Sequence, residues 1–80
     1  MTEREQRVRA VVARVAELEK LDVPAGEHLF DSGIISSFGL TDLIVALQEE
    51  FGVEVPDSEL KPENFGSIQA IEAYLDRPRP

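Results

Sequence analysis

Two adjacent serines, Ser36 and Ser37, are the side chains best placed for chemistry, because they precede a segment with a strong helical pattern. Ser36 is a good N-cap, since its hydroxyl can accept a hydrogen bond from a backbone N–H of the first turn. Gly52 suits the left-handed residue that ends a helix. The apolar residues between them recur at steps of three and four and define one helical face: Leu40, Leu43, Ile44, Leu47 and Phe51. The pattern therefore predicts a helix from these serines to Phe51.

A serine at the start of this helix is suited to carry a phosphate ester. A helix N-terminus offers backbone N–H groups without partners and a dipole that favours an anion. Phe38 follows Ser37 directly, and we expect its ring to be exposed beside the site. Taken alone, a serine pair is more often only a helix cap, so the wider sequence context must decide between the two interpretations.

Other residue types that support catalysis or metal binding are scarce. The sequence has no cysteine, which excludes disulfides and thiolate zinc sites, and His28 is its single histidine. A hydrolase that used Ser37 with Asp31 or Asp42 would still lack a base. We therefore expect a protein that is not an enzyme, with His28 in a surface loop.

The stretch LFDSGIISSFGLTDLIVALQEEFGVEVP, residues 29–56, resembles the core of acyl and peptidyl carrier proteins, and the likeness extends over most of the chain. In that family a serine at the start of the second helix carries a covalent 4′-phosphopantetheine arm, whose thiol holds the cargo as a thioester. The apolar positions and the Val55-Pro56 pair align in a register that assigns the arm to Ser37. Choosing Ser36 shifts every apolar match by one residue. The aspartate that usually precedes the modified serine is Ser36 here.

The resemblance implies a carrier that presents an acyl or aminoacyl group on the arm at Ser37. Tethering raises the effective concentration of the cargo at a docked enzyme. The expected partners are a phosphopantetheinyl transferase, an acyl- or aminoacyl-loading enzyme, and downstream synthases or transferases. They are expected to dock on the helix that begins at Ser36, where the acidic residues have no nearby base. The candidate docking residues are Ser36, Phe38, Asp42, Glu49 and Glu50.

Three features favour a free-standing carrier of a specialised pathway, of the polyketide or nonribosomal-peptide kind, over a housekeeping fatty-acid carrier. They are Ser36 in place of aspartate, the aromatic Phe38, and the segment ELKPENFGSI, residues 59–68, which looks longer than the matching part of fatty-acid carriers. A housekeeping fatty-acid or D-alanyl carrier is the nearest alternative. An alternative of another class is a helical adaptor that has lost the arm and only binds partners.

The charge distribution bears on partners. The chain has 16 acidic and 8 basic residues, and residues 21–60 hold nine acidic residues with no Lys or Arg. Such a segment would repel nucleic acid, which needs a basic surface. It would attract a basic protein partner, although a solvated acidic face is an equally good interpretation. We therefore expect protein partners and no nucleic acid.

Eighty residues without cysteine allow one small domain that depends on packed helices. Thr2 and Glu5 fit a capping box for a first helix from Glu3 to Lys20, and Ser67 fits the N-cap of a last helix. Pro62 can start a short helical turn between them. With the resemblance, this predicts an all-α fold: a small antiparallel bundle of three main helices plus one short helix, a single domain over 1–80 whose residues from about 76 to 80 fray.

The core is predicted to join the three main helices, while the connection over residues 22–35 folds back on it. The predicted core residues are Val12, Val15, Leu43, Leu47, Ile68 and Ile71, and the predicted loop anchors are Leu29, Phe30, Ile34 and Ile35. The sequence has no apolar run long enough to span a membrane and no signal-peptide pattern. We therefore expect a cytoplasmic monomer.

Overall fold

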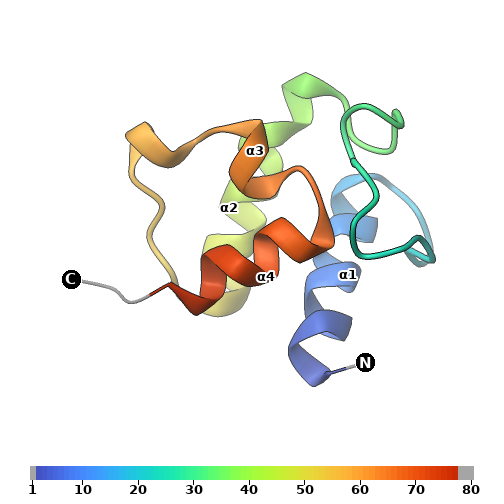
Figure 1. The fold of residues 1–80 in the computed structure, drawn as a ribbon, viewed down its shortest axis with the longest axis horizontal. Helices are drawn as coiled ribbons and strands as arrows, with labels where there is room; N and C mark the ends of the chain where they lie inside the picture. The colour runs from blue at the N-terminus through green and yellow to red at the C-terminus, as the bar shows by residue number, and fades with distance from the viewer. Residues whose placement is uncertain (1, 78–80) are drawn as a thin grey trace.

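The computed structural model describes residues 2–77, with Ser37 described by its backbone alone. Within that range the chain forms four α-helices and two short 3₁₀ helices, with no strand (Figure 1). The elements in order are α1 (Glu3–Val15), η1 (Ser37–Gly39), α2 (Leu40–Phe51), η2 (Asp57–Glu59), α3 (Pro62–Phe65) and α4 (Ile68–Asp76). The predicted all-helical bundle, with three main helices and one short one, is confirmed.

The core lies where α1 packs against both α2 and α4, while α3 packs against α4. Five of the six predicted core residues are buried, namely Val12, Leu43, Leu47, Ile68 and Ile71. Val15, at the end of α1, is only half-buried but packs against this cluster. Phe65 of α3 is also buried, and its ring lies 4.9 Å from that of Tyr74 in α4.

The first helix ends at Val15, not at the predicted Lys20. Glu17 has a left-handed backbone (φ 60°), and its N–H donates to the Arg14 carbonyl at 3.1 Å. The Leu18 N–H donates to the Ala13 carbonyl at 2.8 Å. This pair of bonds is the Schellman pattern that ends helices. Leu18, which continues the apolar spacing of the helix in the sequence, is therefore 47% exposed.

The long connection between α1 and η1 is fastened to the bundle, as predicted. Leu29 and Ile35 are buried, and Phe30 and Ile34 pack against the core. The Leu29 N–H donates to the Gly66 carbonyl at 2.6 Å, next to α4. The Arg9 side chain donates to the Val23 carbonyl at 2.6 Å, which holds the connection to α1. These contacts fasten the loop so that residues 34–36 lie near the end of α1.

Side-chain caps define the starts of α1 and α4. Thr2 Oγ1 accepts from the Glu5 N–H, and Ser67 Oγ accepts from the Ala70 N–H, each at 3.0 Å. The predicted capping box is only half formed, because the Glu5 carboxylate pairs with Arg9 at 3.1 Å. Pro62 stands at the start of α3, as predicted.

The helix α4 extends one residue into the stretch predicted to fray, residues 76–80, and the fraying itself stays a prediction. Asp76 is the last residue of α4 and pairs with Arg4 of α1 at 2.5 Å. Arg4 also pairs with Glu72 at 2.9 Å, and Arg77 pairs with Glu59 at 3.6 Å. Residues 78–80 of the predicted tail lie outside the described residues.

Candidate functional site

The segment around the two serines forms the first turn of the second helix. Ser36 has an extended backbone (φ −72°, ψ 160°), and the helical turn starts at Ser37 and continues into α2. The turn is of the 3₁₀ type, closed by the Gly39 N–H, which donates to the Ser36 carbonyl at 2.8 Å. Gly52 ends α2 with a left-handed backbone (φ 65°), as predicted.

Gly39 is needed for the close packing of this turn. A Cβ at position 39 would lie only 2.8 Å from Cγ2 of the buried Ile35, so a larger residue would displace that side chain. Since Gly39 has no side chain, the Ile35 side chain packs directly against the backbone of this turn.

The predicted capping role of the Ser36 hydroxyl is wrong, although Ser36 does occupy the N-cap position. The structure gives its side chain no cap hydrogen bond. In the 3₁₀ turn it is the Ser36 carbonyl that accepts a bond, from Gly39. The exposed Ser36 side chain is therefore not committed to the backbone of η1.

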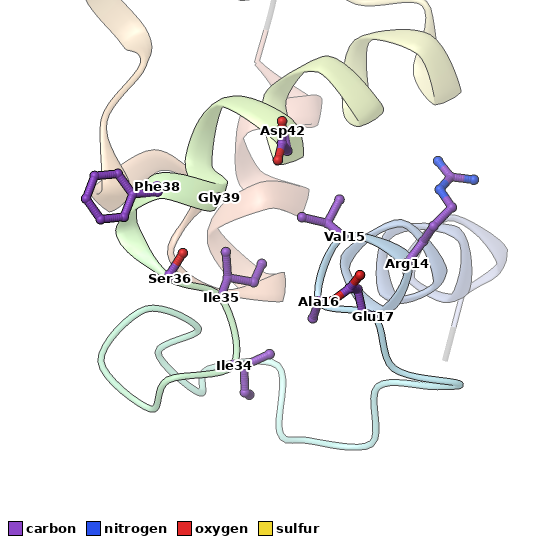
Figure 2. A pocket seen from close by; sticks show the side chains of 10 residues that line it. All are labelled: Arg14, Val15, Ala16, Glu17, Ile34, Ile35, Ser36, Phe38, Gly39 and Asp42. Atoms are coloured by element: carbon purple, nitrogen blue, oxygen red, sulfur yellow. The ribbon is translucent and has the colours of Figure 1, made fainter.

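The other predicted docking residues lie at the surface of η1 and α2, with one exception. Phe38 is 92% exposed, and its ring projects from η1 away from α1 (Figure 2). Asp42 and Glu49 are exposed, and no ion pair joins either of them within residues 2–77. Val45, one turn before Glu49, adds a 47% exposed apolar side chain to this surface.

Glu50 is the exception, and it corrects the prediction that the acidic residues of this helix have no nearby base. Arg7 of α1 approaches the Glu50 carboxylate to 3.1 Å and donates to its backbone carbonyl at 2.9 Å. The same guanidinium lies 4.7 Å from the ring centre of Phe51. Glu50 therefore helps to join α1 to α2, a role that no local sequence signal announces.

A groove of about 600 Å³ lies between the end of α1 and the start of the second helix (Figure 2). We call it the α1–η1 groove. Both neighbours of Ser37 line it, together with the last turn of α1 and residues 34–35. Its lining residues are Arg14, Val15, Ala16, Glu17, Ile34, Ile35, Ser36, Phe38, Gly39 and Asp42. The place of Glu17 here was not predicted, because a non-glycine residue in a left-handed turn leaves no sequence signal.

A second groove of about 430 Å³ lies along α2, between that helix and the segment that follows it. Its lining residues are Leu40, Thr41, Ile44, Val45, Gln48, Val55, Asp57 and Leu60. Gln48 links its two sides, because Gln48 Oε1 accepts from the Val55 N–H at 3.0 Å.

The described residues form no candidate metal site. Over residues 2–77 no group of three or more His, Asp and Glu side chains could hold a metal ion. His28 is exposed in the loop, as predicted. No helix in this part of the chain is long and apolar enough to cross a membrane.

The fold and the site together define a class: a small helical domain with a serine at the exposed start of its second helix. Comparison with known proteins gives the family. The family described as "Phosphopantetheine attachment site" matches residues 6–75, so the chain belongs to the phosphopantetheine-binding carrier proteins. Members of this family carry a covalent 4′-phosphopantetheine and are not themselves catalysts.

Two kinds of curated relatives support this assignment. Aminoacyl carrier protein 2 of Bradyrhizobium diazoefficiens is 36% identical over 73 residues, which cover 89% of this chain and 81% of that protein. The D-alanyl carrier protein of Streptococcus pyogenes serotype M1 is 33% identical over 54 residues, which cover 68% of each chain.

The residues present fit such an arm. The segment that contains Ser37 starts a helix with an extended residue before it and an exposed aromatic after it, so an enzyme could reach it. Gly39 lets Ile35 pack directly against the first turn, which holds the attachment segment in place. The first N–H groups of a helix lack acceptors within the helix and favour an anion such as a phosphodiester. When bound, the arm supplies a thiol that holds the cargo as a thioester.

Proposed function

We propose that this chain is an aminoacyl carrier whose 4′-phosphopantetheine arm is attached at Ser37. The observation that carries the attachment site is the helical register. Ser37 begins the 3₁₀ turn that continues into α2, and the buried Leu43, Ile44 and Leu47 follow it in the register that the resemblance to carrier proteins implies. Ser36 stands outside the helix in an extended conformation.

The intact mass of the protein tests this site. After co-expression with a broadly specific phosphopantetheinyl transferase, the wild-type protein should gain the mass of one arm. Ser37→Ala should abolish the gain, and Ser36→Ala should keep most of it because the Ser36 side chain caps nothing. The reverse pattern would place the arm on Ser36. No gain with several transferases would favour a helical adaptor without an arm.

The class of cargo rests on the relatives. One relative over most of the chain is named an aminoacyl carrier and another a D-alanyl carrier, and both names denote an amino acid as cargo. An aminoacyl group is therefore favoured over the fatty-acyl alternative. A specialised pathway, of the polyketide or nonribosomal-peptide kind, remains the second candidate because Ser36 and Phe38 depart from the usual attachment motif.

Loading assays distinguish these cargoes. The holo protein is incubated with an enzyme that loads aminoacyl carriers and with one that loads D-alanyl carriers. A fatty-acyl-loading enzyme is tested in parallel. We expect thioester formation with an amino acid, read as a mass gain that hydroxylamine removes. Loading by the fatty-acyl enzyme alone would contradict the aminoacyl assignment while leaving the carrier function intact.

Partner enzymes dock, in this proposal, on the face formed by Ser36, Phe38, Asp42, Val45 and Glu49. An exposed aromatic next to unpaired carboxylates matches a partner with an apolar pocket and a basic rim. Glu50 is left out of this face because Arg7 already occupies its carboxylate. The cytoplasmic location and the monomeric state expected from the sequence stay predictions.

A further inference from the structure

The α1–η1 groove is the feature of this molecule that the carrier function does not yet use. It begins at the attachment position, since Ser36, Phe38 and Gly39 all line it. Its far wall is the end of α1, more than twenty residues earlier in the chain. Its volume of about 600 Å³ falls within the range of small-molecule sites, roughly 300–1,000 Å³.

The lining combines an apolar floor with acceptors at the rim. Val15 and Ile35 lie across from one another near the centre of the groove, and Asp42 stands above them (Figure 2). Glu17 places a second carboxylate at the opposite rim, because the left-handed turn after α1 brings it there. Among the described residues, Arg14 alone brings a basic side chain to the lining of the groove.

We propose that the α1–η1 groove is the resting site of the pantetheine portion of the arm. This inference rests on the proposed attachment at Ser37. Pantetheine has an apolar branched end near the phosphate and two amide groups further along. The branched methyl groups match Val15 and Ile35, and the amide N–H groups can donate to the Asp42 and Glu17 carboxylates.

The occupant follows from position and chemistry. Both chain neighbours of Ser37 line the groove, so a group bonded at Ser37 is held close to it, at an effective concentration far above that of any free ligand. The exposed Phe38 ring projects away from α1, so an arm at rest in the groove leaves that ring, Val45 and Glu49 free for a partner (Figure 2). A docked enzyme would then draw the arm out of the groove.

Isotope-filtered NMR on the holo protein tests this placement. The protein is labelled with ¹³C and ¹⁵N, and the arm is installed from an unlabelled donor, so contacts between arm and protein are read selectively. We expect nuclear Overhauser effects from the arm's methyl protons to Val15 and Ile35. We also expect the amide signals of Ala16 and Glu17 to shift between the apo and holo forms.

Matched variants distinguish binding in the groove from effects of substitution elsewhere on α1. Ala16→Leu should fill the groove and abolish the contacts with Val15 and Ile35. Ala10→Leu, at an exposed position of α1 that does not line the groove, should keep them. Glu17→Gln keeps the shape and removes one charge, and we expect weaker contacts. The wild-type spectrum decides the case even if a variant is poorly folded.

Three results would overturn the inference. The arm could contact Ile44 and Leu60 of the second groove, or it could give no contact beyond residues 36–39. Contacts unchanged in a folded Ala16→Leu protein would also contradict it. Each of these leaves the carrier function standing, since the arm is present by mass. A protein that never gains the arm would instead overturn the proposed function, and this inference with it.

Discussion

Glu49 and Glu50 are neighbours on α2 with the same charge, yet only Glu50 has a basic partner. Arg7 contacts both the carboxylate and the backbone carbonyl of Glu50. Glu49 is exposed and has no ion pair within the described residues. Both residues were predicted to serve in docking, because they are adjacent and have the same charge. The partner of Glu50 lies 43 residues away in the chain, so the local sequence does not reveal it. Their substitutions should therefore affect different properties.

We predict that Glu49→Lys slows transfer to or from a partner enzyme and leaves stability within about 0.5 kcal/mol of wild type, as is usual for an exposed site. Glu50→Lys places a second cation against Arg7. It should lower the free energy of unfolding by about 0.5–1 kcal/mol, the range of partly exposed ion pairs. Thermal melting and single-turnover transfer kinetics separate the two effects.

The salt dependence supplies the control for this pair. The slower transfer of Glu49→Lys should approach the wild-type rate as salt is added, because screening weakens attraction between exposed charges. Equal melting temperatures for the two variants would contradict the structural role of Glu50. Transfer kinetics that Glu49→Lys leaves unchanged at low salt would remove Glu49 from the docking face.

At the scale of the elements, α2 is held by the side chains it buries between α1 and α4. Leu47 is 1% exposed, so Leu47→Ala should leave a cavity and cost about 2–5 kcal/mol. A domain of this length is expected to have a total stability of only about 4–12 kcal/mol. Val45→Ala on the same helix is the control, with a cost near 0.5 kcal/mol, because Val45 is 47% exposed. Chemical denaturation measures both, and equal costs would contradict the packing.

The tie between α1 and α4 predicts a pH dependence. The Arg4 guanidinium lowers the pKa of Asp76 below its usual range, mainly through their hydrogen bond. A carboxyl whose pKa is depressed by folding stabilises the protein above its unfolded pKa. This stabilisation is lost as the pH falls through the lower folded pKa.

Asp76→Asn should therefore melt below wild type at pH 7, and the difference should shrink once the pH falls below about 4. Asp22→Asn is the control, since Asp22 is exposed and joins no ion pair within residues 2–77. Melting curves between pH 7 and pH 2 give the comparison. A difference for Asp76→Asn that is constant across this range would contradict the assigned cause.

Some helix boundaries could be predicted from the sequence and others could not. The end of α2 and the start of α4 follow from local signals, namely Gly52 as a stop and Ser67 as a cap. The end of α1 does not, because Leu18 continues the apolar spacing past the true end at Val15. The turn there depends on Glu17 adopting a left-handed backbone and on Arg9 holding the loop that follows. The role of Ser36 was mistaken because a 3₁₀ first turn uses its carbonyl instead of its hydroxyl.

For the molecule as a whole, the distribution of charge explains why an acidic surface stays available to a basic partner. Most arginines of α1 form ion pairs within the chain, since Arg4, Arg7 and Arg9 each bind a carboxylate. Residues 21–60 have no Lys or Arg of their own. Asp42 and Glu49 are therefore left to attract a basic partner, and the α1–η1 groove opens next to this face.

The central claim is that the arm is carried by Ser37 and not by Ser36. Digestion after glutamate is suited to test it, because cleavage at Glu27 and Glu49 releases residues 28–49 as one peptide. Trypsin is less useful, since residues 21–60 contain no Lys or Arg. Electron-transfer fragmentation of the modified peptide can then separate the two serines. The account predicts that the added mass begins with the fragment that includes Ser37. An added mass already present on the fragment that ends at Ser36 would contradict it.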